Sequence, residues 1–388
     1  MRVLNPETIS VYVHWPFCLS KCPYCDFNSH VREKINETEM AKALLSEIDH
    51  FSQLIGNRRL TSIFFGGGTP SLMSAGTVEA VINRLIKKFT ASDDIEITLE
   101  ANPTSVEASK FADFSGAGIN RVSLGIQALN DQDLKALGRE HSAAEAMAAI
   151  EVSQKYFKRS NFDLIYARMG QTTAEWEKEL MQAIKMANGH LSLYQLTIEK
   201  GTPFYGRWRV GDLIIPDEDL SAEMYALTNQ VCAENNYPAY EISNYAKPGE
   251  ESRHNLCYWT YQDYIGVGAG AHGRITINGK TLATEQNKKP ETWLKSVLSR
   301  GHATKISDPL SQTMMAEEMI MMGLRLTKGI DNKDFEKRIG SPLETFIQKE
   351  RMELLKAQGF LSAGNSNLIQ LTEKGRPLLN QILGQILV

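Results

Sequence analysis

The sequence predicts an α/β fold built on parallel strands, and two patterns in its first half lead to this prediction. Six short runs of β-branched or aromatic residues each precede a longer segment with apolar residues at helical spacing. Six such units in a row favour parallel strands joined by right-handed crossovers. The pattern fits a doubly wound open sheet and part of a (β/α) barrel equally well. In both folds, ligands bind at the carboxyl ends of the strands.

The strands are expected at regular intervals along the first half. They are residues 11–14, 63–65, 95–99, 122–124, 162–165 and 191–196. Apolar stripes between them predict helices over residues 44–55, 78–89 and 176–187. The third of these helices has a capping-box start, with Thr172 as the N-cap and Glu175 three residues later.

The second half changes character. A loop is expected over residues 197–216, then a helix over 217–235, a strand over 240–244 and a stretch rich in glycine and aromatics over 246–274. From about residue 309 the chain predicts a small α+β unit that resembles a winged-helix module. Its expected parts are helices at 314–324, 334–339 and 343–358, a ribbon at 361–371 turning around Gly364 and Asn365, and a last helix. The expected domain limits are 1–245, 246–308 and 309–388.

The composition excludes several classes of protein. The chain has 388 residues, of which 42% are hydrophobic and 23% charged, as in ordinary globular proteins. The net charge of −4 gives no basic excess that would indicate nucleic acid. No apolar run approaches the length of about 18 residues that a spanning helix needs. The N-terminus shows no signal-peptide pattern, so we expect a cytoplasmic protein.

Three of the five cysteines lie close together. Cys18, Cys22 and Cys25 follow the first predicted strand at C-x3-C-x2-C spacing, whereas Cys232 and Cys257 are remote. In a reducing compartment such a group binds metal or performs redox chemistry more often than it forms a disulfide. Sulfur ligands favour an iron–sulfur cluster or zinc. On a 4Fe–4S cluster three thiolates leave one iron open. The alternative is a Cys3His zinc site with His14 or His30 as the fourth ligand.

The cysteine motif and five neighbouring segments resemble those of radical S-adenosylmethionine (SAM) proteins, in particular the HemN/HemW group. This group contains oxygen-independent coproporphyrinogen oxidases and their heme-chaperone relatives. The segments are Tyr-Val-His-Trp-Pro-Phe-Cys at 12–18, Phe-Gly-Gly-Gly-Thr-Pro at 65–70, Glu-Ala-Asn-Pro at 100–103, Arg-Val-Ser-Leu-Gly-Ile-Gln at 121–127 and Gly-Arg-Glu-His at 138–141. They occur in the expected order, and the resemblance covers nearly the whole chain.

The resemblance implies a fold and a set of cofactors. The fold is a partial (β/α)6 TIM-like barrel with a small C-terminal α+β winged-helix-like domain. The metal center is one 4Fe–4S cluster held by Cys18, Cys22 and Cys25, with SAM on the open iron. The residues that the resemblance places around SAM are Tyr12, Gly67, Gly68, Thr69, Glu100, Gln127, Arg139 and Asp163.

Within the group, the resemblance is closer to the heme chaperones (HemW) than to the oxidases. The oxidases carry a further cysteine where this chain has Phe27, and a longer segment before the cluster. Residues 253–259 match the H-N-x-x-Y-W motif of the chaperones, which makes His254 the candidate heme ligand. This branch implies binding of heme, transfer to acceptor hemoproteins and a reductant such as flavodoxin or ferredoxin. The alternative function is oxidative decarboxylation of coproporphyrinogen III.

Three other features carry less weight. At residues 163–172, relatives usually have the sequence Asp-Leu-Ile-Tyr-Gly-Leu-Pro-Gly-Gln-Thr. This chain has Ala167, Arg168 and Met169 in place of Gly-Leu-Pro. We expect Arg168 to be solvated rather than to contact a heme propionate. The glycines of residues 266–271 lack the strand–turn–helix frame of a dinucleotide loop. The basic residues of the C-terminal unit are interrupted by acidic ones, so no nucleic-acid partner is expected. Peripheral membrane contact is left open.

Overall fold

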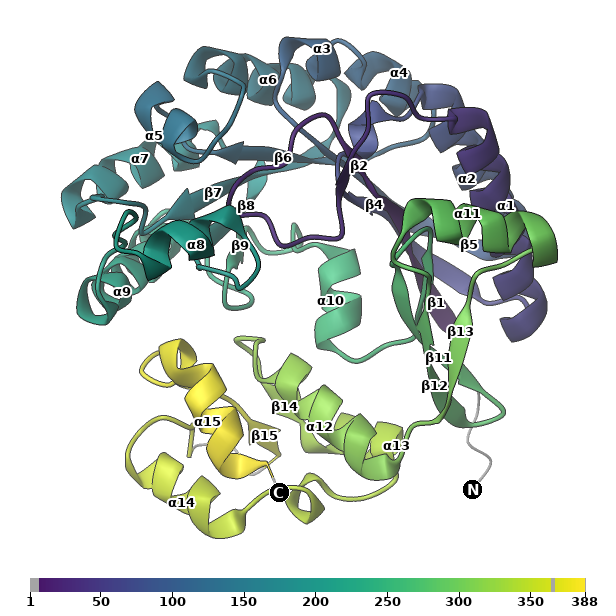
Figure 1. Cartoon of the computed structure of the whole chain (residues 1–388). Helices are drawn as coiled ribbons and strands as arrows, with labels where there is room; N and C mark the ends of the chain where they lie inside the picture. The colour runs from purple at the N-terminus through teal and green to yellow at the C-terminus, as the bar shows by residue number, and fades with distance from the viewer. Residues whose placement is uncertain (1–6, 364–366, 388) are drawn as a thin grey trace.

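The computed structural model describes residues 7–363 and 367–387. Within them the dominant element is a sheet of eleven strands in the order β13-β12-β11-β10-β1-β4-β5-β6-β7-β8-β9 (Figure 1). From β1 to β8 all neighbours are parallel, and the helices between them cover the outer face of the curved sheet. The expected partial (β/α)6 barrel is therefore confirmed, and the doubly wound sheet, which has helices on both faces, is excluded.

The barrel alternates between strands and helices. The strands are β1 (Thr8–Trp15), β4 (Arg59–Gly67), β5 (Thr90–Ala101), β6 (Arg121–Gln127), β7 (Arg159–Tyr166) and β8 (Gly189–Gln195). The helices are α1 (Glu37–Ile55), α2 (Ala75–Lys88), α3 (Ser105–Ala108), α4 (Phe111–Gly116), α5 (Asp131–Ala136), α6 (Ala143–Tyr156) and α7 (Thr173–Met186). Two short strands, β2 (Phe17–Cys18) and β3 (His30–Val31), lie between β1 and α1, and a 3-10 turn, Pro70–Leu72, follows β4.

The predicted apolar stripes form the contacts between helices and sheet. On α1, Leu44, Ile48 and Phe51 are fully buried in the main core. The capping box of α7 is present: the Thr172 hydroxyl accepts from the backbone N–H of Glu175, and the Glu175 carboxylate accepts from the N–H of Thr172 at 2.9 Å. The three helices that were predicted by range therefore correspond to α1, α2 and α7, whereas α3 to α6 were not predicted individually.

The region after β8 extends the same sheet on both edges. Its elements are α8 (Pro203–Arg209), α9 (Glu218–Glu234), β9 (Asn244–Ala246), α10 (Arg253–Trp259), β10 (Tyr264–Val267), β11 (His272–Ile277), β12 (Lys280–Glu285), α11 (Pro290–Arg300) and β13 (Lys305–Pro309). Strand β10 runs parallel to β1, and β11 to β13 continue antiparallel. A Cβ on Gly266 or Gly268 would collide with the backbone of His272 or His14, so these glycines serve close strand packing rather than a nucleotide.

Two predictions in this region are wrong. The expected loop over residues 197–216 contains α8, which begins at Pro203 after the Thr202 cap and is anchored by the buried Phe204. The expected strand over residues 240–244 is displaced, because only Asn244–Ala246 pairs with β8. Both errors arise where tertiary contacts decide between weak local preferences.

The C-terminal unit has a second core, formed mainly by its own helices. Its elements are α12 (Gln312–Gly323), β14 (Ile330–Asp331), α13 (Asn332–Ile339), a 3-10 turn at Leu343–Thr345, α14 (Lys349–Ala357), β15 (Leu368–Ile369), a 3-10 turn at Arg376–Leu378 and α15 (Leu379–Ile386). The helix expected over 343–358 is interrupted, since Ile347 forms a bridge with Leu387. The expected ribbon keeps one bridge, Leu361 to Leu371, while β15 pairs with β14. Its predicted turn at Gly364 and Asn365 lies outside the described residues.

Buried ion pairs join this unit to the barrel. Asp263, whose side chain is fully buried, accepts from Arg58 Nη1 at 2.8 Å and from Arg338 Nη2 on α13 at 2.7 Å. The Arg325 guanidinium lies over the Trp259 ring and pairs with Glu241 at 3.0 Å. In Figure 1, α10 accordingly lies between the inner side of the sheet and the C-terminal unit. In the described part of the chain, no helix is long and apolar enough to cross a membrane.

Replacing Asp263 tests this junction. Asp263→Ala leaves the buried Arg58 guanidinium without a counter-charge, and breaking such a buried pair costs about 3–5 kcal/mol. We expect the free energy of unfolding in urea to fall by that amount. The control, Glu353→Ala, removes an exposed pair with Lys356 and should change it by less than about 0.5 kcal/mol. Equal effects of the two substitutions would contradict the buried junction.

Candidate functional site

One pocket at the carboxyl ends of the barrel strands gathers nearly all the residues that the sequence assigned to a cluster and to SAM. Only Tyr12 and His254 of the predicted set do not line it. The residues that do are Cys18, Cys22, Cys25, Gly67, Gly68, Thr69, Glu100, Gln127, Arg139 and Asp163. Segments more than 140 residues apart in the chain therefore converge on a single site.

The three cysteines lie on the loop that leaves β1. The parallel pair of β2 and β3 closes the two ends of this loop, and the N–H of Cys25 donates to the Cys22 carbonyl at 3.1 Å. All three thiols are free. Burial raises the pKa of the Cys18 and Cys25 thiols, so each holds its proton more firmly than an exposed cysteine. A soft metal ion displaces such protons on binding.

Two glycines let β4 end directly against the cysteine loop. The N–H of Gly68 donates to the Trp15 carbonyl at 2.7 Å. A Cβ on Gly68 would lie 2.5 Å from the Phe17 carbonyl oxygen, and one on Gly67, which has φ +118°, would lie 2.6 Å from the His14 ring. No other residue type fits at either position without displacing the loop.

Arg139 brings a positive charge to the cysteines. Its Nη1 donates to Cys22 Sγ at 3.2 Å, and its Nη2 donates to Asn102 Oδ1 at 2.7 Å and to the Gly125 carbonyl at 2.9 Å. Its Nε is buried and has no partner, which leaves a donor for an anionic group of a ligand. Sequence reasoning missed Asn102 as a site residue, although the Glu-Ala-Asn-Pro segment contained it.

Two carboxylates line the deep side of the pocket. Burial, followed by the nearby Asp163 carboxylate, raises the pKa of Glu100 to about 8. Burial raises the pKa of Asp163 to about 6. Glu100 accepts from the N–H of Gly67 at 3.2 Å, and Asp163 accepts from Ser123 and from Asn161. Carboxylates that titrate near neutral pH in a cleft are suited to a ligand that carries positive charge or hydroxyl groups.

Tyr12 supports the site from beneath rather than lining it. Its ring packs under Gly66, and its hydroxyl is 3.1 Å from His14 Nδ1. The other His14 nitrogen, Nε2, is 2.9 Å from the Asn28 carbonyl, so both nitrogens are occupied. Across residues 7–363 and 367–387, no group of three or more His, Cys, Asp or Glu side chains is arranged around a single ion. The contacts therefore leave His14 without a free nitrogen for the Cys3His zinc alternative, and its other candidate, His30, has a buried Nε2 without a hydrogen-bond partner.

Both ring nitrogens of His254, the heme ligand predicted from the sequence, are hydrogen-bonded in this structure. Its side chain is 1% exposed, and burial lowers its pKa to about 3. Ser62 Oγ donates to Ser10 Oγ, so it accepts from His254 Nδ1 at 2.8 Å, and His254 Nε2 accepts from the Tyr258 hydroxyl at 2.7 Å. The imidazole is therefore neutral, and neither nitrogen is free for iron.

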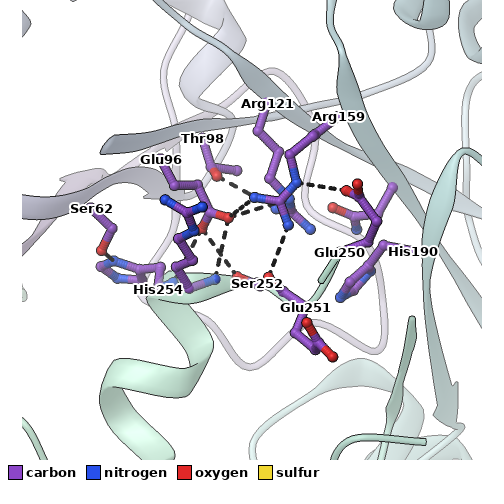
Figure 2. Close-up of polar contacts among 12 residues, drawn as sticks. Ser62, Glu96, Thr98, Arg121, Arg159, His190, Glu250, Glu251, Ser252 and His254 are labelled. Atoms are coloured by element: carbon purple, nitrogen blue, oxygen red, sulfur yellow. Dashed lines mark hydrogen bonds and ion pairs between the residues drawn. The ribbon is translucent and has the colours of Figure 1, made fainter. Parts of the chain in front are cut away.

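The helix that carries His254 is held to the barrel by a buried carboxylate. Figure 2 shows Glu96 between Arg159 and the start of α10. Glu96 accepts from Arg159 Nη1 at 2.7 Å and from the backbone N–H groups of Arg253 and His254 at 3.2 and 3.1 Å. The Phe64 ring stacks on the His254 ring with centroids 4.9 Å apart. These contacts place the H-N-x-x-Y-W motif inside the barrel, behind Tyr12.

Arg168 is buried, so its expected exposure to solvent is wrong. Its side chain is 2% exposed and forms ion pairs with Asp133 and Glu179. Ala167 adopts φ +54°, and the Arg168 guanidinium lies back under the end of β7, where it meets these two carboxylates from other segments.

Comparison with known proteins agrees with this geometry. Residues 12–183 match the radical SAM superfamily, and residues 310–378 match the HemN C-terminal domain. The heme chaperones HemW of Haemophilus influenzae and Escherichia coli are 37% and 36% identical to the chain, and each match covers 97% of both proteins. A zebrafish (Danio rerio) protein named radical S-adenosyl methionine domain-containing protein 1, mitochondrial, is 37% identical over 98% of the chain and 87% of its own length. The solved coproporphyrinogen III oxidase HemN of E. coli superposes with a TM-score of 0.82 at 22% identity, covering 99% of this chain and 91% of its own, which shows a shared fold.

A partial barrel that places three free cysteines beside a glycine-lined strand end defines the class of radical SAM proteins. Within that class, the chain belongs to the HemN/HemW family.

The two carboxylates predict a pH dependence of ligand binding. SAM carries a sulfonium and an ammonium, so it should bind best when Asp163 and Glu100 are ionised. Its affinity should therefore rise as pH increases from 6 to 8, by about tenfold for each charge-assisted hydrogen bond that forms. Calorimetric titration with SAM at several pH values measures this affinity in wild type, Glu100→Gln and Asp163→Asn. In each variant, part of the rise in affinity with pH should disappear. A wild-type affinity that does not change over this range would contradict it.

Proposed function

We propose that this chain binds heme and passes it to acceptor hemoproteins, and that it does so on a scaffold carrying one 4Fe–4S cluster and SAM. The observation that carries the proposal is the match to proteins named heme chaperone HemW over 97% of both chains. The pocket supports it, because every cysteine and nearly every SAM residue that the resemblance implied lines one cavity.

The residues present fit these cofactors. The free thiols of Cys18, Cys22 and Cys25 line one pocket, and as thiolates they would hold an iron–sulfur cluster. When bound, the cluster supplies the electron for reductive cleavage of SAM. Arg139 would pair with the carboxylate of SAM through its free Nε, and Glu100 and Asp163 would accept from its ammonium and ribose hydroxyls. Gly67 and Gly68 would keep the end of β4 close against the cysteine loop, where both line the pocket.

Phe27 supports the chaperone branch over decarboxylation. It lines the pocket where the oxidases carry a further cysteine, and its side chain is 63% exposed. Because Phe27 carries no thiol, the chain lacks the further cysteine that the resemblance assigns to the oxidases. Anaerobic turnover of coproporphyrinogen III by the reconstituted protein would contradict this choice.

A reductant of the flavodoxin or ferredoxin kind and respiratory acceptors complete the proposal. The cytoplasm is the proposed location, although several relatives are named mitochondrial.

Heme ligation by His254 requires its Nε2 lone pair to be released. That lone pair accepts from the Tyr258 hydroxyl, so this bond must break before iron can bind, whereas the Nδ1–H bond to Ser62 can remain. Tyr258→Phe removes the first of these bonds but keeps the imidazole. If His254 is the ligand, weakening its attachment should speed heme binding, because the binding-competent state becomes more populated.

A titration of four proteins tests this step. We expect Tyr258→Phe to bind heme several times faster than wild type, and His254→Gln to lose the wild-type Soret band. The matched control is His190→Gln, which alters an equally buried histidine bonded to Tyr240 at 3.0 Å and should leave the Soret band unchanged. A wild-type spectrum in His254→Gln would remove His254 as a ligand.

A further inference from the structure

Arg168 is a buried cation that lies under the end of β7. Its Nη1 donates to the Ile165 carbonyl at 2.7 Å, and its Nη2 donates to Asp133 Oδ2 at 2.6 Å and to Glu179 Oε2 at 2.5 Å. The Glu179 side chain is 8% exposed and that of Asp133 is 25% exposed. One guanidinium therefore forms ion pairs with two carboxylates, one from α5 and one from α7.

Burying charged side chains lowers the stability of the fold unless each charge has a partner. Removing one partner of a buried ion pair leaves an uncompensated charge, which costs several kcal/mol. The usual Gly-Leu-Pro of the family carries no charge at this place, so this chain holds the loop after β7 by a different means. Each of the two carboxylates in turn holds a further segment of the pocket wall.

Glu179 holds the segment that follows β6. Its Oε1 accepts from the buried N–H of Leu129 at 2.7 Å. Two residues earlier, Gln127 adopts φ +72°, a left-handed conformation that a residue with a Cβ adopts only when its surroundings impose it. Gln127 lines the pocket. Arg168 neutralises the carboxylate that anchors this strained turn.

Asp133 holds α5, which leads directly to Arg139. The N–H of Arg139 donates to the Leu134 carbonyl at 2.8 Å, so the end of α5 fixes where the Arg139 backbone lies. Gly138 packs against Pro23 of the cysteine loop, where a Cβ would lie 2.5 Å from Pro23 Cδ. A movement of α5 would therefore shift the guanidinium that contacts Cys22.

We propose that Arg168 is a positioning residue, which fixes Gln127 and Arg139 on the SAM side of the pocket through Glu179 and Asp133. The inference rests on the proposed SAM site. The guanidinium lies under the end of β7, out of reach of any bound molecule, and acts only through the turn after β6 and through α5.

The test compares two arginines that each pair with two carboxylates, the buried Arg168 and the half-buried Arg159. Arg168→Met removes the ion pairs beside the pocket. Arg159→Met removes pairs with Glu96 and Glu250 at the opposite, amino end of the barrel. Each reconstituted protein is assayed for iron content, for SAM affinity by calorimetry, and for the change that SAM causes in the electron paramagnetic resonance spectrum of the reduced cluster. Urea unfolding measures the loss of stability in both.

We expect Arg168→Met to keep its iron, to bind SAM about tenfold more weakly and to show a smaller spectral change with SAM, since contacts to a displaced Arg139 are worth about one charge-assisted hydrogen bond. Arg159→Met should lose similar stability and keep wild-type SAM affinity. Arg168→Lys, which retains the charge, should recover part of the affinity.

Two results would overturn the inference: SAM affinity in Arg168→Met within twofold of wild type, or an equal loss in Arg159→Met. If Arg168→Met does not fold, Asp133→Asn replaces it, because it weakens only the α5 arm at a partly exposed position, and unchanged affinity there overturns the role of that arm. Wild-type protein that holds iron but fails to bind SAM would instead overturn the proposed function.

Discussion

The parallel pairing of β1 with β4 continues past the ends of both strands, and the rest of the site depends on it. Beyond Trp15, backbone bonds from Gly68 to Trp15 and from Thr69 to Phe17 join the cysteine loop to the turn that follows β4. The next strands around the barrel then bring Glu100, Gln127 and Asp163 to the same end. Parallel strands make this convergence automatic, because their carboxyl ends all lie on one side.

Residue patterns predicted the parts of the molecule that local chemistry decides. Cysteine spacing, glycines at the end of a strand and capping residues act over a few positions, and the structure has them where they were expected. Motif order along the chain then selected the barrel over the open sheet. The Glu-Ala-Asn-Pro segment also held the signal for Asn102, whose bond to Arg139 only the folded chain reveals.

The errors lie where distant segments meet. Arg168 appeared solvated because its partners, Asp133 and Glu179, are 35 and 11 residues away in sequence. For His254, which stays a predicted heme ligand, the contact with Ser62 could not be predicted, because Ser62 is 192 residues away and nothing local places α10 inside the barrel. Helix α8 was missed since the burial of Phe204 outweighs the turn-rich composition around it. Helix α10 also connects two regions of the molecule. Its His254 ring lies beside the Tyr12 ring of β1, and its Trp259 ring contacts Arg325 of the C-terminal unit.

In the proposed function, Cys18, Cys22 and Cys25 hold a 4Fe–4S cluster with one open iron. Chemical analysis of anaerobically reconstituted protein, combined with its resonance spectrum before and after addition of SAM, tests it most directly. We expect about four irons and four sulfides per chain, and a resonance spectrum that changes when SAM is added. Protein that takes up zinc but neither iron nor sulfide, or whose cluster spectrum is unchanged by SAM, would contradict it.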